Sequence, residues 1–185
     1  MSRIGVFGGQ FDPPHNGHPA IVRAARDQLG LDRVLVVPSA RPPHRPAPAT
    51  PAETRYRLAQ AAFAGEPGVE VSRIELDRHG PDYTAETLEA LAGPGRELYL
   101  IVGADQLAAM ASWHRPERVR ELAHVVVAAR PGAPAADMAE RLAIEPVNLS
   151  SSALRRRIGE GRDVRSMMPD AVVDAITREG LYTDD

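Results

Sequence analysis

The chain has 185 residues, the size of one domain, and its 43% hydrophobic and 25% charged residues are ordinary for a globular protein. A net charge of −3 argues against a nucleic-acid platform, and no apolar run approaches the ~20 residues of a membrane span. All 22 basic residues are arginine, which excludes P-loop and Schiff-base lysines, and the lack of cysteine excludes disulfides and thiolate metal sites. Without cysteine or an evident signal peptide, we expect a cytoplasmic protein.

Short apolar runs alternate with longer amphipathic stretches. The apolar runs predict five strands: Ile4–Phe7, Val34–Pro38, Val69–Ser72, Leu98–Val102 and Val125–Ala129. The amphipathic stretches predict six helices: Pro19–Leu29, Ala52–Phe63, Ala85–Leu91, Pro116–Leu122, Ser152–Gly159 and Pro169–Glu179. Because alternating strands and helices form right-handed crossovers, the pattern predicts an α/β fold with a doubly wound, Rossmann-like parallel sheet. We expect one domain, residues 1–185, with a short C-terminal helical segment at about residues 150–185.

The segment between the first strand and the first helix carries the strongest functional signal. Gly8 and Gly9 would admit a phosphate close to the backbone, at a helix start whose free N–H groups attract anions. Because Pro19 suits a first helical turn, His18 is predicted at or beside the N-cap, with His15 nearby. The two histidines could instead cap the helix or bind a metal, but no third ligand is evident, so phosphate binding is favoured.

Three further clusters are weaker signals. Ser150 to Ser152 could be an ordinary N-cap, but three hydroxyls followed by Arg155 also suit a second anion site. Gly103 and Asp105 end a strand, where the carboxylate could accept from a ribose hydroxyl or simply form a turn. Trp113, the only tryptophan, fits a core position as well as a ligand platform.

In this order the motifs resemble the nucleotidyltransferases marked by a His-x-Gly-His signature, here His15-Asn16-Gly17-His18, and more closely the bacterial nicotinate-nucleotide adenylyltransferases. The similarity runs from Gly5 to Tyr182. Its other blocks are Gly8-Gly9-x-Phe11-Asp12-Pro13, Pro42-Pro43-His44-Arg45, Tyr83-Thr84-Ala85-Glu86-Thr87-Leu88, Gly103-x-Asp105, Trp113-His114, Arg130-Pro131-Gly132, Ser150-Ser151-Ser152 with Arg155, Met168-Pro169-Asp170 and Gly180-Leu181-Tyr182. Each block alone is weak, whereas the ordered set is highly specific.

The resemblance implies a reaction and its partners. ATP and nicotinate mononucleotide would give deamido-NAD and pyrophosphate, a step of NAD biosynthesis, by direct in-line attack without a covalent intermediate. Catalysis would then rest on positioning and charge stabilisation. Mg²⁺ would arrive with ATP, held mainly by phosphates and water, so no side chain is expected to ligate a metal. A homo-oligomer is compatible with the sequence, which does not fix the oligomeric state.

The resemblance also implies residue roles. His15 and His18 would be catalytic, with His18 stabilising the α-phosphate. ATP would be bound by Gly8, Gly9, Gln10, Phe11, His15, His18, Gly103, Asp105, Ser150, Ser151, Ser152 and Arg155. The mononucleotide would be bound by His44, Arg45, Tyr83, Thr84 and Trp113. Main-chain N–H groups around Tyr83 and Thr84 would receive the nicotinate carboxylate, and Trp113 would stack near the pyridine ring.

Three departures from the family pattern bear on substrate choice. Gln10 stands where a small hydroxyl residue is usual, and Ser152 replaces the usual Thr. Asp82 stands where Ser is common, and its carboxylate could repel an acid substrate unless it points away. Asp82 therefore keeps nicotinamide mononucleotide open as the acceptor.

Other functions remain as alternatives. One alternative is a pantetheine-phosphate adenylyltransferase, but those enzymes commonly carry Thr at the position of His15, so His15 argues against it. A cytidylyltransferase of the same superfamily is another alternative. A tRNA synthetase would be longer and would need a lysine-bearing motif. A non-catalytic nucleotide-binding module could have lost His18, which is present here.

Overall fold

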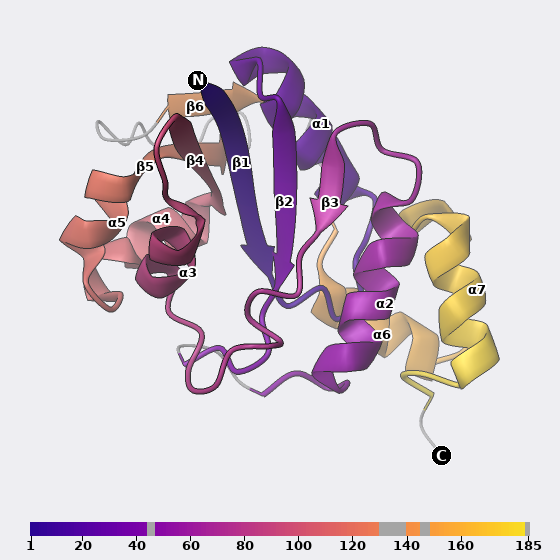
Figure 1. Ribbon diagram of the computed structural model, residues 1–185. Coiled ribbons are helices and arrows are strands. Elements are labelled where there is room, and N and C mark those ends of the chain that lie inside the picture. The colour runs from indigo at the N-terminus through magenta and orange to yellow at the C-terminus, as the bar shows by residue number, and fades with distance from the viewer. Residues whose placement is uncertain (44–46, 130–139, 145–148, 184–185) are drawn as a thin grey trace.

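The computed structural model describes residues 1–43, 47–129, 140–144 and 149–183, and its six strands form one parallel sheet (Figure 1). The sheet order is β3-β2-β1-β4-β5-β6, and every neighbouring pair is parallel. The strands are β1 (Ser2–Gly9), β2 (Arg33–Pro38), β3 (Val69–Val71), β4 (Arg96–Gly103), β5 (Ala123–Ala129) and β6 (Glu140–Ala143). The doubly wound α/β fold predicted from the sequence is thereby confirmed.

Helices cover both faces of the sheet (Figure 1). One face carries α1 (Gly17–Leu29), α2 (Ala52–Phe63), α6 (Ser151–Gly159) and α7 (Asp170–Glu179). The other carries α3 (Thr84–Leu91), α4 (Ala104–Ala109) and α5 (Pro116–Leu122). A short 3₁₀ turn, η1 (Met110–Ser112), follows α4, and a second one, η2 (Arg165–Met167), precedes α7. Within the described residues, no helix combines the length and apolarity that a membrane crossing requires.

The strands form because their side chains are buried on both faces. Along β2, Val34 and Val36 enter the core beneath α1 and α2, whereas Leu35 and Val37 enter the core beneath α3 and α5. This period of two explains why the strands read as continuous apolar runs. Gly5 in β1 has no room for a larger residue, because a Cβ there would come within 2.8 Å of Leu31.

Sequence and structure differ where burial is sparse. β6 was not predicted because, of its four side chains, only Leu142 is buried, so no apolar run marks the strand. Similarly, α4 has no buried residue and therefore no amphipathic pattern. The start predicted for α1 was wrong: the helix begins at Gly17, so His18 lies inside the first turn. The His18 N–H already bonds to the His15 carbonyl, 2.9 Å away, which sets the turn before Pro19.

Candidate active site

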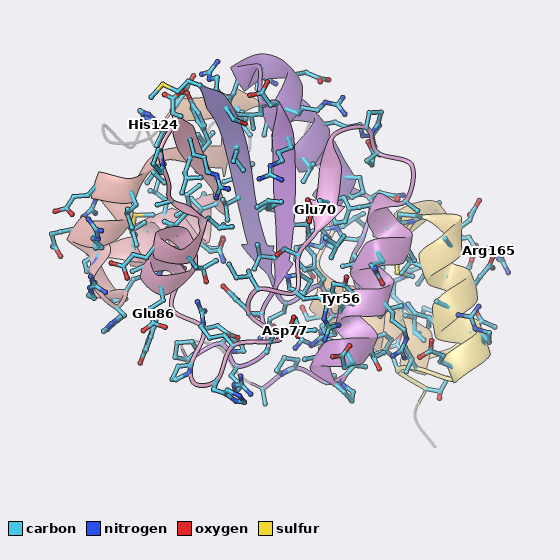
Figure 2. The ribbon with its side chains drawn as sticks, in the orientation of Figure 1. Tyr56, Glu70, Asp77, Glu86, His124 and Arg165 are labelled. Carbon is cyan, nitrogen blue, oxygen red and sulfur yellow. The ribbon has the colours of Figure 1, made fainter. Side chains whose placement is uncertain are left out.

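A cavity of about 460 Å³ opens where the parallel strands β1, β2 and β4 end. In a doubly wound sheet this is the edge at which ligands bind. Figure 2 shows Asp77 and Glu86 toward this edge and His124 toward the opposite one. The cavity brings together seven residues that the sequence assigned to the site: Gly8, Gly9, Gln10, Tyr83, Thr84, Asp105 and Trp113. His44 and Arg45 were also assigned to it, but both lie outside the described residues.

The two histidines of the signature form a stacked pair, with ring centroids 3.9 Å apart. The His18 ring also meets the Phe11 ring edge-on at 5.1 Å. Each imidazole accepts a backbone hydrogen bond at Nδ1: the His15 N–H donates to His18 at 2.9 Å, and the Gly17 N–H donates to His15 at 3.2 Å. Because Nδ1 is an acceptor in both rings, each neutral ring carries its proton on Nε2.

Burial keeps this pair uncharged. It lowers the pKa of His15 to about 4. Burial, reinforced by the neighbouring His15, also holds the pKa of His18 well below its usual value. Near neutral pH the rings are therefore hydrogen-bond donors through Nε2–H rather than cations.

The serine cluster divides into three roles. Ser150 is the N-cap of α6, and its Oγ accepts from the Ala153 N–H at 3.3 Å. The Ser151 hydroxyl donates to the Pro13 carbonyl at 2.8 Å, so it holds the loop after β1. The Oγ of Ser152 lies 3.3 Å from that of Ser150, and Ser152 is exposed. The start of α6 is thus attached to the loop that bears the histidines.

Arg155 is attached to the same loop. Its Nη1 donates to the Asp12 carbonyl at 2.6 Å and lies 3.9 Å from the Asp12 carboxylate. The side chain remains 33% exposed. One face of the guanidinium therefore stabilises the loop while the rest is accessible to an anion.

Phe11 and Gly9 pack against each other at the end of β1. Phe11 has a φ of 51°, and its side chain is 2% exposed. A Cβ on Gly9 would come within 3.0 Å of the Phe11 ring, so this glycine makes room for an aromatic side chain as well as for a ligand. Any contact between Phe11 and ATP must then come from the main chain.

Arg55 is a structural member of the site that sequence reasoning missed. This residue of α2 is 1% exposed. Its Nη1 donates to the Gln10 carbonyl at 2.7 Å, and its Nε donates to the Thr50 carbonyl at 3.1 Å. No local pattern could have identified Arg55, because its partner Gln10 is 45 residues away.

Two buried carboxyl groups line the opposite end of the cavity. Asp82 accepts at Oδ2 from the Arg41 N–H, while its buried Oδ1 has no hydrogen-bond partner. Glu75 accepts from the Thr87 hydroxyl at 2.7 Å, and burial raises its pKa to about 7. Arg78 lies 3.9 Å from Asp82 Oδ1 and 4.0 Å from Glu75. Asp82 is thus a residue of the cavity wall whose side chain is only 1% exposed, with its carboxylate held against the Arg41 N–H and near Arg78, and Glu75 is a site residue that the sequence did not suggest.

Aromatic rings border the same end. The Tyr83 ring packs on the His114 ring with centroids 4.1 Å apart, and both residues line the cavity. Trp113 lines the cavity too, while it packs against the core beneath α3 and α5. The tryptophan is thus both core and cavity wall.

Gly103 and Asp105 occupy the turn from β4 into α4. A Cβ on Gly103 would come within 2.7 Å of Asp105 Oδ1, so a larger residue there would displace this exposed carboxylate. Asp105 is exposed and lines the cavity, where its free oxygens could accept from a sugar hydroxyl. In the part of the chain that the structure describes, no group of three or more His, Asp or Glu side chains is placed to hold a metal ion.

Comparisons with known proteins identify the family and the fold. The model of the cytidylyltransferase-like family matches residues 6–157. A probable nicotinate-nucleotide adenylyltransferase from Thermus thermophilus is 45% identical, covering 97% of this chain and 99% of that protein. One from Roseiflexus castenholzii is 42% identical, covering 97% and 98%. The fold matches the Plasmodium falciparum nicotinic acid mononucleotide adenylyltransferase complexed with NaAD, with a TM-score of 0.79, 17% identity and 98% of both chains covered. The chain therefore belongs to the cytidylyltransferase-like family and, within it, to the nicotinate-nucleotide adenylyltransferases.

Proposed function

We propose that this protein transfers the adenylyl group of ATP to the 5′-phosphate of nicotinate mononucleotide, giving deamido-NAD and pyrophosphate in NAD biosynthesis. The observation that carries the proposal is the neutral pair of His15 and His18, whose Nε2–H groups follow a glycine loop at the ligand-binding edge. The proposal includes action in the cytoplasm on small-molecule substrates, with neither nucleic acid nor membrane as a partner.

The reaction is a direct displacement. An oxygen of the mononucleotide phosphate forms a bond to the α-phosphorus of ATP as the bond from that phosphorus to the bridging oxygen breaks. The electron pair of the broken bond leaves with pyrophosphate. Negative charge on the α-phosphate oxygens would be met by Nε2–H of His18 and His15. The N-terminus of α1 would contribute through the helix dipole alone, because its first N–H groups are already hydrogen-bonded.

The remaining donor-side residues would orient ATP. Gly8, Gly9 and the backbone of Gln10 would face the nucleotide from the end of β1. Asp105 would accept from the ribose. Ser152 and the accessible face of Arg155 would hold the outgoing pyrophosphate.

Mg²⁺ belongs to the proposal as a companion of ATP. The described residues contain no cluster suited to binding it, so we route no step through a protein-bound ion. Mg²⁺ prefers to keep several waters and to be held by substrate phosphates. Bound in that way, it would neutralise charge on the triphosphate.

The acceptor would bind at the end of the cavity near α3. The main-chain N–H groups around Tyr83 and Thr84 at the start of this helix would receive the nicotinate carboxylate, with Thr84 as the main donor because the Tyr83 N–H already donates to the Pro81 carbonyl at 3.2 Å. Trp113 would lie beside the pyridine ring. His44 and Arg45, which are outside the described residues, belong to the proposal as ligands of the mononucleotide phosphate. The buried carboxyls of Asp82 and Glu75 favour a second candidate acceptor, nicotinamide mononucleotide, whose amide carries no negative charge.

The test is a product assay with ATP, Mg²⁺ and one acceptor at a time. Nicotinate mononucleotide, nicotinamide mononucleotide and phosphopantetheine are supplied separately, and products are separated by chromatography. We expect deamido-NAD to form fastest. Faster use of either other acceptor would overturn the acceptor assignment, and no adenylylated product from any of them would overturn the proposed function.

A further inference from the structure

The loop after β1 is held by residues distant in sequence. Its carbonyls accept from Arg55 at Gln10, from Arg155 at Asp12 and from Ser151 at Pro13, with distances of 2.6–2.8 Å. These anchors come from α2 and α6, whereas the loop itself is irregular. The position of His15 and His18 therefore depends on contacts outside the loop.

The Asp12 side chain is the centre of these contacts. It is 1% exposed and accepts from the Ala49 N–H at 2.6 Å and from the Thr50 hydroxyl. A third donor is the hydroxyl of Tyr182, which lies 2.7 Å from Oδ1. Because hydrogen bonds to a buried carboxylate are stronger than neutral ones, each donor restricts where Asp12 can lie.

Tyr182 follows α7 and joins the last part of the chain to the first loop. Its φ is 64°, a left-handed conformation that a bulky residue adopts only when its surroundings hold it there. The ring packs against the core beneath α1 and α2, and the residue does not line the cavity. Any influence of its hydroxyl on the reaction must pass through Asp12 or Thr50, which lies 3.3 Å away.

We propose that Tyr182 is a positioning residue for the transfer reaction: its hydroxyl fixes Asp12, and Asp12 fixes the loop that presents His15 and His18 to the phosphates. This inference rests on the proposed function for its kinetic part only. The Asp12 carbonyl also binds Arg155, so movement of Asp12 would shift both anion-binding groups together.

The test is Tyr182→Phe, which removes one oxygen and keeps the ring. We expect kcat to fall about tenfold, the scale of one hydrogen bond to a charged group, with the KM of the acceptor mononucleotide unchanged. The matched control is Tyr56→Phe on α2, whose hydroxyl lies 3.5 Å from the Val71 carbonyl (Figure 2). It should leave kcat unchanged.

A second readout needs no activity. The N–H groups of His15, Asn16, Gly17 and His18 are all hydrogen-bonded, so loosening of the loop should speed their hydrogen exchange. We expect these amides to exchange faster in Tyr182→Phe than in the wild type, and at the wild-type rate in Tyr56→Phe. If the wild type makes no product, the proposed function fails while the exchange experiment still tests the loop.

Three results would overturn the inference. Unchanged kcat with a lower melting temperature would make Tyr182 a purely structural contact. Lower kcat without faster exchange would show that the effect does not travel through the loop. An equal loss of kcat in Tyr56→Phe would indicate general loosening.

Discussion

The proposed site has a phosphate end, the loop from Gln10 to His18, and an acceptor end, the cavity wall around Asp82, and the two are held in different ways. At the phosphate end, Arg55, Ser151 and Arg155 each donate to a loop carbonyl. At the acceptor end, Oδ1 of Asp82 and both Nε and Nη1 of Arg78 are buried without hydrogen-bond partners. A buried polar atom without a partner costs free energy that a paired one does not.

This difference suggests a division of labour. A loop held in this way keeps its phosphate-facing donors in place. Such donors need little reorganisation when charge builds on a phosphate, which suits the chemical step. At the acceptor end the unpaired atoms belong to the side chains of Arg78 and Asp82, which lie 3.9 Å apart at their nearest, and Arg78 does not line the cavity. The proton demands are opposite as well: burial keeps His15 neutral by lowering its pKa and favours neutral Glu75 by raising its pKa.

The largest expected effect is at the phosphate end. Because His18 would donate to the transition state, His18→Asn, whose Oδ1 can still accept from the His15 N–H, should lower kcat ~10²-fold or more. The measurement is steady-state product formation at saturating substrates. The control is His124→Ala, at the opposite edge of the sheet, which should keep full activity (Figure 2). Retained turnover in His18→Asn would remove the assigned role.

The next effect is on stability at the acceptor end. Glu75 has a folded pKa of about 7, above its usual 4.5, so the stability it contributes below pH ~4.5 is lost as the pH rises through 7. Glu75→Gln removes the cost of ionising a buried carboxyl and keeps an acceptor for the Thr87 hydroxyl. Its unfolding free energy relative to wild type should rise by about 2–3 kcal/mol between pH 4.5 and 8.

Urea unfolding followed by Trp113 fluorescence at several pH values measures this difference. Glu70→Gln is the control, because Glu70 is exposed on β3 and lies 3.7 Å from Arg33 (Figure 2). Glu70→Gln should not reproduce the effect of Glu75→Gln, because Glu70 is not buried. A pH-independent effect of Glu75→Gln would mean that Glu75 is not the titrating group.

The smallest effect concerns acceptor choice. Asp82→Asn keeps an acceptor for the Arg41 N–H and removes one negative charge from the cavity wall. The KM of nicotinate mononucleotide should fall by about threefold to tenfold, the scale of one partly screened charge, with little change for the amide. Steady-state kinetics with both acceptors measure this. A higher KM for the acid would show that the Asp82 charge assists binding.

Much of the fold could be predicted from the sequence, because strands that are buried on both faces consist of continuous apolar residues. Strands β1, β2, β4 and β5 were found this way, whereas β6, with one buried side chain, was not. The glycine, histidine and serine clusters could be seen because their members are neighbours in the chain. Contacts such as Asp12 with Tyr182, 170 residues apart, leave no local pattern and needed the structure.

Because the pKa values of His15 and His18 are lowered, binding of ATP beside these rings would depend on pH. A triphosphate placed against these rings would favour their protonated forms, since opposite charges stabilise each other at short range. By reciprocity, whatever the anion does to proton affinity, protons do to anion affinity. Acidification toward the His15 pKa of about 4 would therefore tighten the hold on ATP while removing the neutral imidazoles that the free protein presents at neutral pH.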